Sequence, residues 1–377
     1  MNIEIPATNE ADVSAPPPQD SPHTTRRRMT RSMNIGGIKV GGGSPISVQT
    51  MTKTKTADVE ATVKQIVEAA EAGCDIVRVT VNDKEAADAI GQIVRQSPIP
   101  VVADIHFNHI FALKAIEGNV AKVRLNPGNI GNLDRIHQVL SAAKDKGIPI
   151  RIGVNSGSLE EDILEKHGYP TAEALYESAM RHVGICDQFG FRDVIISVKS
   201  TDVRLMIEAY RLVAARTDIP LHLGVTEAGP TRTGTIKSAV GIGALLAEGI
   251  GDTIRVSLTD EPVKEIEVGK EILRSLGLAS RNVELIACPT CGRLEVDLFG
   301  IMRELEERLH GIKKPVKIAV LGCVVNGPGE ASEADIGIAA GKGVAILYRK
   351  GEVIRRVKES EIVDVIVEEV ERFRPDC

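Results

Sequence analysis

One pattern repeats eight times along the sequence: a short run rich in valine and isoleucine, a polar turn, and then a stretch of helical periodicity. Helical stretches include residues 59–72, 133–146, 172–189 and 263–276, and several are followed by glycine, as at a helix C-terminus. Strands that alternate with helices predict a parallel sheet, and eight pairs in this length favour a closed (β/α)8 barrel, or TIM barrel, over an open sheet. The eight runs are ISVQT, DIVRVTV, VVADIHF, KVRLNP, PIRIGVN, DVIISVK, LHLGVT and TIRVSL.

The length of 377 residues exceeds what one barrel needs, and the pattern changes near residue 276. We predict an α/β protein in four parts, which are a disordered extension at 1–30, the barrel at 31–276, a linker at 277–282 and a smaller α+β domain at 283–377. The extension is rich in Pro, Ser and Thr and lacks the apolar core of a secretory signal. Six cysteines without such a signal predict a cytoplasmic protein with reduced thiols.

The composition argues against two classes of partner. The formal net charge is -6, aromatic residues make up 3% of the chain, and there is no Trp. Without a basic balance or many aromatic rings we expect no nucleic acid partner, and without a long apolar run we expect no membrane span. An anionic ligand must therefore be bound by local cations.

Polar residues gather near the carboxyl ends of the predicted strands, where barrel enzymes build their active sites. Four of them are cations, and any one alone is as readily a solvated loop residue or half of an ion pair. Because unpaired charges are costly inside a barrel, the four together favour an anionic ligand such as a phosphate or diphosphate. Glu227 is then either a proton donor or acceptor, or a counter-ion. The full set is Arg78, Asp104, His106, Arg124, Arg151, Asn155, Lys199, Thr226, Glu227 and Ser257.

Three cysteines occur in two motifs of the predicted smaller domain. Cys288 and Cys291 lie in ACPTCGR, and Cys323 lies in LGCVVNGPGE. Three thiolates with an incomplete fourth position suit an iron-sulfur cluster, but the spacing leaves a zinc site equally open and a redox pair possible. The glycines and proline of NGPGE predict a tight loop whose backbone N–H groups point at the cluster sulfurs, with Glu330 within reach of the same centre.

These motifs, together with RLNPGN, RIGVNSGSL, HLGVTEAG and RVSLTD, closely resemble the bacterial 4-hydroxy-3-methylbut-2-enyl diphosphate synthases of the methylerythritol phosphate pathway. The resemblance runs from about residue 27 to residue 373. It implies a barrel like that of dihydropteroate synthase, followed by a domain like the cluster half of sulfite reductases. It also implies a 4Fe-4S cluster held by Cys288, Cys291, Cys323 and Glu330.

The resemblance further implies an oxidoreductase of isoprenoid biosynthesis. The reaction is the two-electron reductive ring opening of 2-C-methyl-D-erythritol 2,4-cyclodiphosphate, with loss of water, to 4-hydroxy-3-methylbut-2-enyl diphosphate. Reduced flavodoxin or ferredoxin would supply the electrons. We expect Glu227 to be the proton-donating acid and Asp104 to orient His106 or a substrate hydroxyl. The expected substrate ligands are Arg78, Arg124, Arg151 and Lys199, with Asn155, Thr226, Ser257 and His106 as uncharged or switchable partners.

Two other functions stay open on the residues alone: a zinc-stabilised barrel transferase of the pterin-binding kind, and a ligand sensor whose cluster reports redox state. For assembly we predict a head-to-tail homodimer. A helix at 263–276 descends about 21 Å, whereas the five residues GLASR can climb back only about 17 Å. A cluster domain on that tether is better placed to close the barrel of a partner, which the resemblance also implies.

Overall fold

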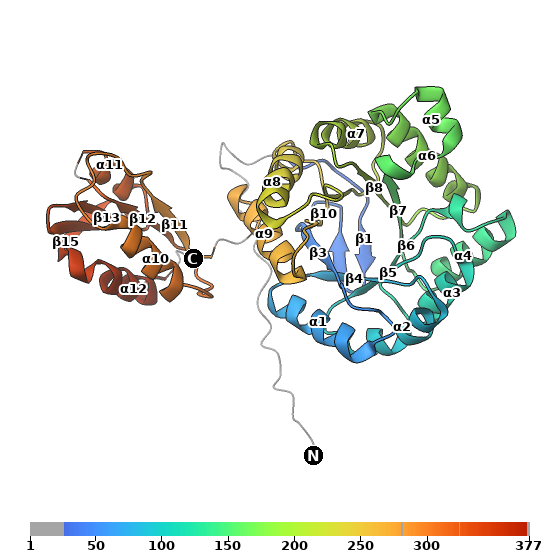
Figure 1. The fold of residues 1–377 in the computed structure, drawn as a ribbon, viewed down its shortest axis with the longest axis horizontal. Coiled ribbons are helices and arrows are strands. Elements are labelled where there is room, and N and C mark those ends of the chain that lie inside the picture. The colour runs from blue at the N-terminus through green and yellow to red at the C-terminus, as the bar shows by residue number, and fades with distance from the viewer. Residues whose placement is uncertain (1–25, 280–281, 324, 375–377) are drawn as a thin grey trace, which may run out of the picture. The chain divides into compact units, whose positions relative to one another are not determined.

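The computed structural model describes residues 26–279, 282–323 and 325–374. The chain divides into two compact units, residues 1–279 and 280–377 (Figure 1). No helix in the described part of the chain is both long and apolar enough to cross a membrane.

Eight parallel strands form the wall of the larger unit, and each lies in a run predicted to be a strand. Hydrogen bonds join them in the order β8-β7-β6-β5-β4-β3-β10-β9, and a parallel bridge from Ile196 in β8 to Leu221 beside β9 brings the two ends together. The predicted (β/α)8 barrel is confirmed. The strands are β3 (Ser47–Met51), β4 (Ile76–Thr80), β5 (Val101–Asp104), β6 (Lys122–Arg124), β7 (Ile150–Asn155), β8 (Val194–Lys199), β9 (His222–Leu223) and β10 (Thr253–Ile254).

A helix follows each strand and packs against the outside of the ring (Figure 1). The carboxylates of Asp58 and Asp83 cap two of these helices by accepting a hydrogen bond from a backbone N–H in the first turn. An extra short helix, α5 (Glu161–His167), lies between β7 and α6. The eight helices are α1 (Val59–Glu71), α2 (Lys84–Gln96), α3 (His109–Glu117), α4 (Leu133–Asp145), α6 (Ala172–Gln188), α7 (Val203–Arg216), α8 (Thr231–Ala247) and α9 (Pro262–Ser275).

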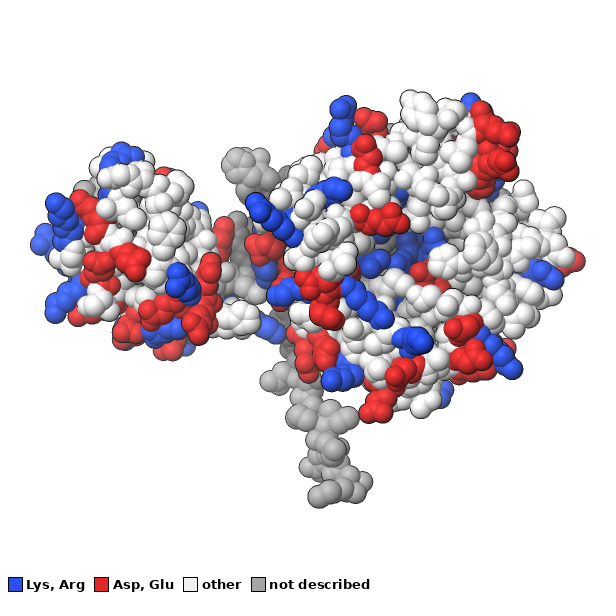
Figure 2. Space-filling model, in the orientation of Figure 1, with Lys and Arg blue, Asp and Glu red and all other residues white. Residues whose placement is uncertain are grey.

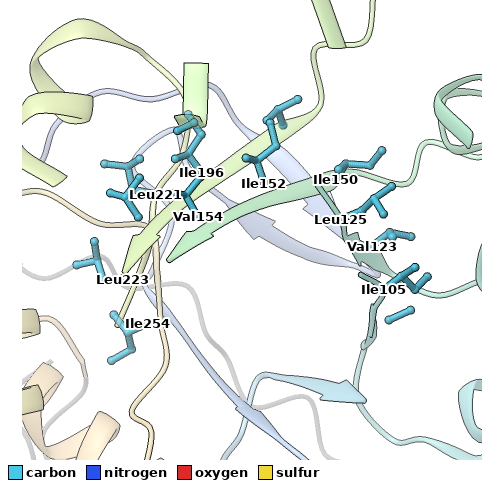
Figure 3. Packing of buried hydrophobic residues seen from close by; sticks show 14 of the residues in the cluster. Ile105, Val123, Leu125, Ile150, Ile152, Val154, Ile196, Leu221, Leu223 and Ile254 are labelled. Atoms are coloured by element: carbon cyan, nitrogen blue, oxygen red, sulfur yellow. The ribbon is translucent and has the colours of Figure 1, made fainter. Parts of the chain in front are cut away.

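Successive side chains of each barrel strand point alternately outward, toward the helices, and inward, into the ring. Val123 of β6 and Ile150 and Ile152 of β7 are fully buried and belong to one cluster with apolar helix residues (Figure 3). Burying each such side chain contributes about 1.5–3 kcal/mol. The residues between them, such as Arg124 and Arg151, point the other way, into the ring. The same alternation that builds the hydrophobic core therefore lines the interior with polar groups.

A hairpin that the sequence analysis did not predict packs at the start of the barrel strands. It pairs β1 (Met33–Ile35) with β2 (Ile38–Val40) through a turn at Gly36 and Gly37, which both have positive φ, as a two-residue hairpin turn requires. Its apolar residues share a cluster with the first halves of three barrel strands, so it closes the amino-terminal end of the ring. The cluster contains Met33, Ile35, Val40, Ile76, Val102 and Ile195.

The predicted disordered extension needs a correction at its end. Residues 1–25 lie outside the described residues. Arg28, however, donates its backbone N–H to the Gly249 carbonyl at 2.9 Å, and the Thr30 hydroxyl donates to Asp252 at 3.0 Å. The prediction is wrong for residues 27–30, because these hydrogen bonds fix them against the barrel.

The smaller unit is a five-stranded sheet with helices, in keeping with the α+β prediction. Its strand order is β11-β12-β13-β14-β15. The first three strands are parallel to one another, β14 pairs antiparallel with β13, and β15 pairs antiparallel with β14. Helices α10 and α12 share one apolar cluster with the sheet, and α11 belongs to a second. The elements are β11 (Glu284–Ala287), α10 (Leu298–Arg308), β12 (Lys317–Leu321), α11 (Gly327–Ser332), β13 (Ile336–Gly341), β14 (Val344–Arg349), β15 (Glu352–Lys358) and α12 (Ile362–Arg372).

Candidate functional site

Basic side chains outnumber acidic ones inside the barrel. Six cations from the wall face two carboxylates, Asp104 of β5 and Glu265 of α9, and Figure 2 shows Lys and Arg atoms lining the hollow of the larger unit. Four of the six were predicted as substrate ligands from the sequence. The cations are Arg78, Lys122, Arg124, Arg151, Lys199 and Arg255.

Asp104 is the carboxylate at the centre of the predicted site. Its oxygens lie 3.6 Å from Arg78 Nε and 3.4 Å from Arg124 Nη1. Burial by itself raises the pKa of Asp104, but the charges of Arg78, Arg124 and Arg151 outweigh that effect and hold its pKa below the ordinary value. Asp104 therefore stays ionised and orders the guanidinium groups around it.

Arg151 is the most deeply buried of the predicted cations. It is 2% exposed, and its Nη1 donates to Ser197 Oγ at 2.5 Å. Its Nε and Nη2 have no hydrogen-bond partner among the described residues. Burial, followed by the charges of Arg78 and Arg124, lowers its pKa well below the ordinary value. Two unpaired donors on a buried cation are costly, and an anionic oxygen would satisfy them.

Lys199 reaches into the same space from β8. It is 6% exposed, and its Nζ makes no hydrogen bond to any described residue. A Cβ at Gly224 would lie only 2.6 Å from this Nζ, so a side chain larger than hydrogen there would displace the ammonium group. Burial, with the charges of Arg151 and Arg255, lowers the pKa of Lys199 well below its ordinary value.

Sequence reasoning missed Arg255 and its partner. Arg255 Nη2 lies 3.5 Å from Glu265 Oε1, and Glu265 also accepts hydrogen bonds from the Thr50 hydroxyl and the Leu258 backbone N–H. The alternation of side chains along a strand could have identified Arg255. This residue stands two positions before Ser257 in the run TIRVSL, and the two side chains therefore share one face. Nothing in the sequence points to Glu265, which reaches the site from a helix.

A deeper polar group, also missed, lies inside the ring. Lys122 is fully buried and donates to Gln49 Oε1 at 3.3 Å across the barrel, from β6 to β3. His222 Nδ1 lies 2.6 Å from Thr253 Oγ1, and its Nε2 has no partner among the described residues. Burial, then the charge of Lys199, lowers the pKa of His222 well below its ordinary value, so His222 is neutral.

The remaining predicted residues lie at or beyond the ends of the strands. His106 is exposed. Its pKa is lowered, because partial burial and the charges of Arg124 and Arg78 together outweigh the charge of Asp104, which raises it. Asn155, Thr226 and Ser257 are half-buried, and within the described ranges no hydrogen bond joins their side chains to the cations.

Glu227 follows β9 in an exposed loop, and the structure does not bring it into contact with the cations. Its side chain forms no hydrogen bond or ion pair with any described residue. Its φ is 50°, in the left-handed region that a non-glycine residue adopts only at a cost. Strained positions of this kind concentrate at functional sites.

In the smaller unit, the three predicted cysteines lie just beyond two neighbouring parallel strands. Cys288 follows β11, and its Sγ lies 3.7 Å from the position that a Cβ on Gly322 would take, next to Cys323. A hydrogen bond from the Arg293 side chain lowers the pKa of Cys291. Backbone N–H groups of Asn326 and Val325 donate toward Cys323 and lower its pKa.

The chemistry of this donor set fits an iron-sulfur cluster. Thiols stabilised as thiolates by backbone N–H groups and by an arginine are what such clusters require. Glu330 is exposed on α11, four residues beyond Asn326. Across residues 26–279, 282–323 and 325–374 no three His, Cys, Asp or Glu side chains converge closely enough to share a metal ion. Binding of a cluster by all four predicted residues would therefore require them to move closer together.

Comparison with known families matches the GcpE TIM-barrel domain at residues 30–270 and the GcpE protein C-terminal domain at residues 284–372. A relative from Clostridium perfringens is 58% identical over 92% of this chain and 99% of its own. Another, from Bacillus licheniformis, is 54% identical over 93% of this chain and 94% of its own. Both are named 4-hydroxy-3-methylbut-2-en-1-yl diphosphate synthase (flavodoxin). Among solved structures, a dihydropteroate synthase from Stenotrophomonas maltophilia is 12% identical over 64% of this chain and 98% of its own, with a TM-score of 0.46, which is too low to support an argument.

Proposed function

The chain belongs to the GcpE family, and from this premise we propose that it catalyses the reductive ring opening of 2-C-methyl-D-erythritol 2,4-cyclodiphosphate. The product is 4-hydroxy-3-methylbut-2-enyl diphosphate, and the reaction consumes two electrons and two protons and releases one water. The family resemblance drawn from the motifs is confirmed by relatives that carry this product in their name.

The observation that carries the proposal is the surplus of cations in the barrel. Six basic and two acidic side chains leave a cavity that is complementary to a small, multiply charged anion. The unpaired donors of Arg151 and the unbonded ammonium of Lys199 are the groups we assign to the diphosphate oxygens. A cyclic diphosphate supplies the charge and the acceptors that the barrel by itself lacks.

We assign the protons to the chain's own residues. Departure of a hydroxyl as water needs an acid, and Glu227, in its strained loop after β9, is the one we propose. Its exposure implies that the loop closes over bound substrate before the proton moves. Asp104 keeps Arg78 and Arg124 in place and lies two residues before His106, so it is assigned a positioning role.

The smaller unit is proposed to hold a 4Fe-4S cluster through Cys288, Cys291, Cys323 and Glu330. When bound, the cluster supplies electrons one at a time. A carboxylate is a weaker ligand for iron than a thiolate, so Glu330 is the ligand that most easily gives way. We infer that the donor is reduced flavodoxin, the protein in the relatives' name, although a ferredoxin delivers electrons of the same kind.

Anaerobic purification with iron and sulfide analysis tests the cofactor. We expect about four irons and four sulfides per chain and a broad visible absorbance that bleaches in air. A colourless protein with one zinc per chain would instead indicate the barrel transferase of the pterin-binding kind. The redox sensor is tested by turnover, since a sensor would carry the cluster and convert no substrate.

Replacing Arg151 with methionine should separate binding from stability. Loss of the guanidinium should weaken substrate binding by about 1.5–3 kcal/mol, which is roughly a 10- to 150-fold rise in Kd. Without ligand, the melting temperature should hold or rise, because the variant buries a hydrophobic side chain in place of an incompletely paired cation. Calorimetric titration and thermal melts measure the two effects. Arg211→Met, on the exposed face of α7, is the control that should change neither; tight binding by Arg151→Met would remove Arg151 from the site.

The homodimer remains a proposal that rests on the family resemblance. Eight residues, 276–283, separate α9 from β11, rather than the five that the tether argument assumed, and fully extended they span about 27 Å. The tether therefore no longer excludes closure within one chain. Mixing Glu227→Ala with Cys323→Ala under conditions that exchange subunits decides between the two arrangements. If sites form between chains, about a quarter of the wild-type sites should be restored. No recovery despite demonstrated exchange would mean that each chain closes its own site.

A further inference from the structure

Helix α10 of the smaller unit exposes an unusual face. Its buried side carries Leu298, Ile301 and Leu305, which pack into the core of the sheet. Phe299, Arg303 and Glu306 are exposed, and Met302 is half-buried between them and the core, so the four recur at helical spacing along a second side of the helix. Phe299 is 66% exposed in a chain that has only six phenylalanines and no tryptophan. Phe107 in the larger unit is also exposed, so what distinguishes Phe299 is that it lines the same pocket as Cys288.

This face borders a pocket of about 340 Å³ that reaches one of the proposed cluster ligands. The lining combines residues that follow β11 with residues of α10, and Cys288 lies among them beside Phe299. A partner seated here would be in contact with the cluster-binding loop without entering the barrel. The lining includes Cys288, Thr290, Phe299, Met302, Arg303 and Glu306.

The face carries one cation and one carboxylate, Arg303 and Glu306, and a second cation, Arg293, lies close to the cysteines. Arg303 is exposed and forms no ion pair with any described residue, whereas Arg308, further along the same helix, is paired with Asp364 at 2.6 Å. Arg293, also exposed, donates to Cys291. Glu306 lies one turn beyond Met302 and Arg303. The pocket thus combines apolar side chains with a cation that forms no ion pair with any described residue, a composition that suits an aromatic group.

We propose that this face of α10 is the docking surface for the flavin-bearing edge of reduced flavodoxin. The inference rests on the proposed function and names the entry point for its electrons. A flavin mononucleotide lies at the edge of its carrier's sheet with its phosphate bound by the carrier, so the part that it presents is the planar ring. Such a ring can stack on Phe299 and take a cation–π contact from Arg303. A shallow site suits a donor that must dissociate after each visit, because redox encounters use small interfaces.

The electron balance agrees with repeated docking. Each visit would deliver one electron from the reduced flavin, and the carrier would be oxidised by one electron. Two visits and two protons balance the reaction, in which the ring C–O bond is broken reductively and one hydroxyl leaves as water.

The test compares two variants of the face with two matched variants elsewhere in the same unit. Phe299→Ser and Arg303→Glu alter the proposed surface, while Val353→Ser and Arg355→Glu change exposed residues of β15, the strand at the opposite edge of the sheet from β11. Each full-length holoenzyme is titrated anaerobically with flavodoxin to measure Kd. Turnover is then measured with flavodoxin and, separately, with reduced methyl viologen, a small donor that needs no docking surface.

We expect both variants of the face to raise the Kd for flavodoxin by about tenfold or more, with a matching loss of flavodoxin-driven turnover. The β15 variants should stay within about twofold of wild type, and viologen-driven turnover should be unchanged in all four. Unchanged flavodoxin affinity in both Phe299→Ser and Arg303→Glu overturns the proposal. So does loss of viologen-driven turnover at unchanged Kd, since the face would then serve the substrate. Failure of wild type to convert substrate with viologen would reject the proposed function itself, whatever the Kd values show.

Discussion

Cys323→Ala is expected to abolish turnover and to lose most of the iron and sulfide from the purified protein. Backbone N–H groups of the loop that follows β12 donate toward Cys323 and lower the pKa of its thiol, which favours the thiolate that binds iron. Removing it leaves two thiolates and one carboxylate, too few to hold a cubane against water and oxygen. Iron and sulfide content, visible absorbance and turnover with reduced viologen measure the loss.

Two further variants make this result specific. Glu330→Ala should keep the cluster and lose most turnover, because three thiolates still hold the cubane while water takes the fourth position. Cys186→Ala is the control: Cys186 is fully buried in α6 of the barrel, where burial raises its pKa to about 12, and it should keep both cluster and activity. Full activity in Glu330→Ala would contradict the role given to that carboxylate.

Glu227→Gln is expected to lower kcat by about 10²- to 10⁴-fold, which corresponds to roughly 3–5 kcal/mol of transition-state stabilisation. Substrate affinity should stay within a few fold, because glutamine keeps the shape of the side chain and removes only its proton. Single-turnover rates with reduced viologen and the substrate Kd separate the two effects. Glu117→Gln, at the exposed end of α3, is the matched control and should leave both unchanged.

The comparison with Arg151 strengthens that test. We expect the rate to fall at Glu227 and the affinity to fall at Arg151, because one residue is assigned to proton transfer and the other to diphosphate binding. If Glu227→Gln weakened binding and Arg151→Met changed only the rate, the two roles would be reversed.

Strand alternation made the barrel and its cations predictable from the sequence. A run such as KVRLNP places Val123 outward and Arg124 inward by its period of two, and the repeat of eight such runs sets the topology. The same rule, applied to every strand, also identifies Lys122 and Arg255. Neither was predicted: Lys122 is the first residue of β6, two residues before Arg124, and Arg255 stands directly after β10, two residues before Ser257.

Other features have no signature in local sequence. The hairpin at residues 33–40 consists of two three-residue strands, and only their packing on Ile76, Val102 and Ile195 shows that they close the barrel. Glu265 reaches Arg255 from a helix through tertiary packing alone. Among the described residues, Glu227 forms no hydrogen bond or ion pair, and no three His, Cys, Asp or Glu side chains lie close enough to share a metal ion.

One assay tests directly whether this chain reduces a cyclic diphosphate. Holoenzyme purified without oxygen is incubated with 2-C-methyl-D-erythritol 2,4-cyclodiphosphate and reduced methyl viologen, and product formation is followed by phosphorus NMR together with viologen oxidation. The account predicts 4-hydroxy-3-methylbut-2-enyl diphosphate at one equivalent per two electrons consumed, and no product from Cys323→Ala. The opposite result would be a protein that carries a full cluster and oxidises many equivalents of viologen but leaves the substrate intact. That result would contradict the proposed reaction.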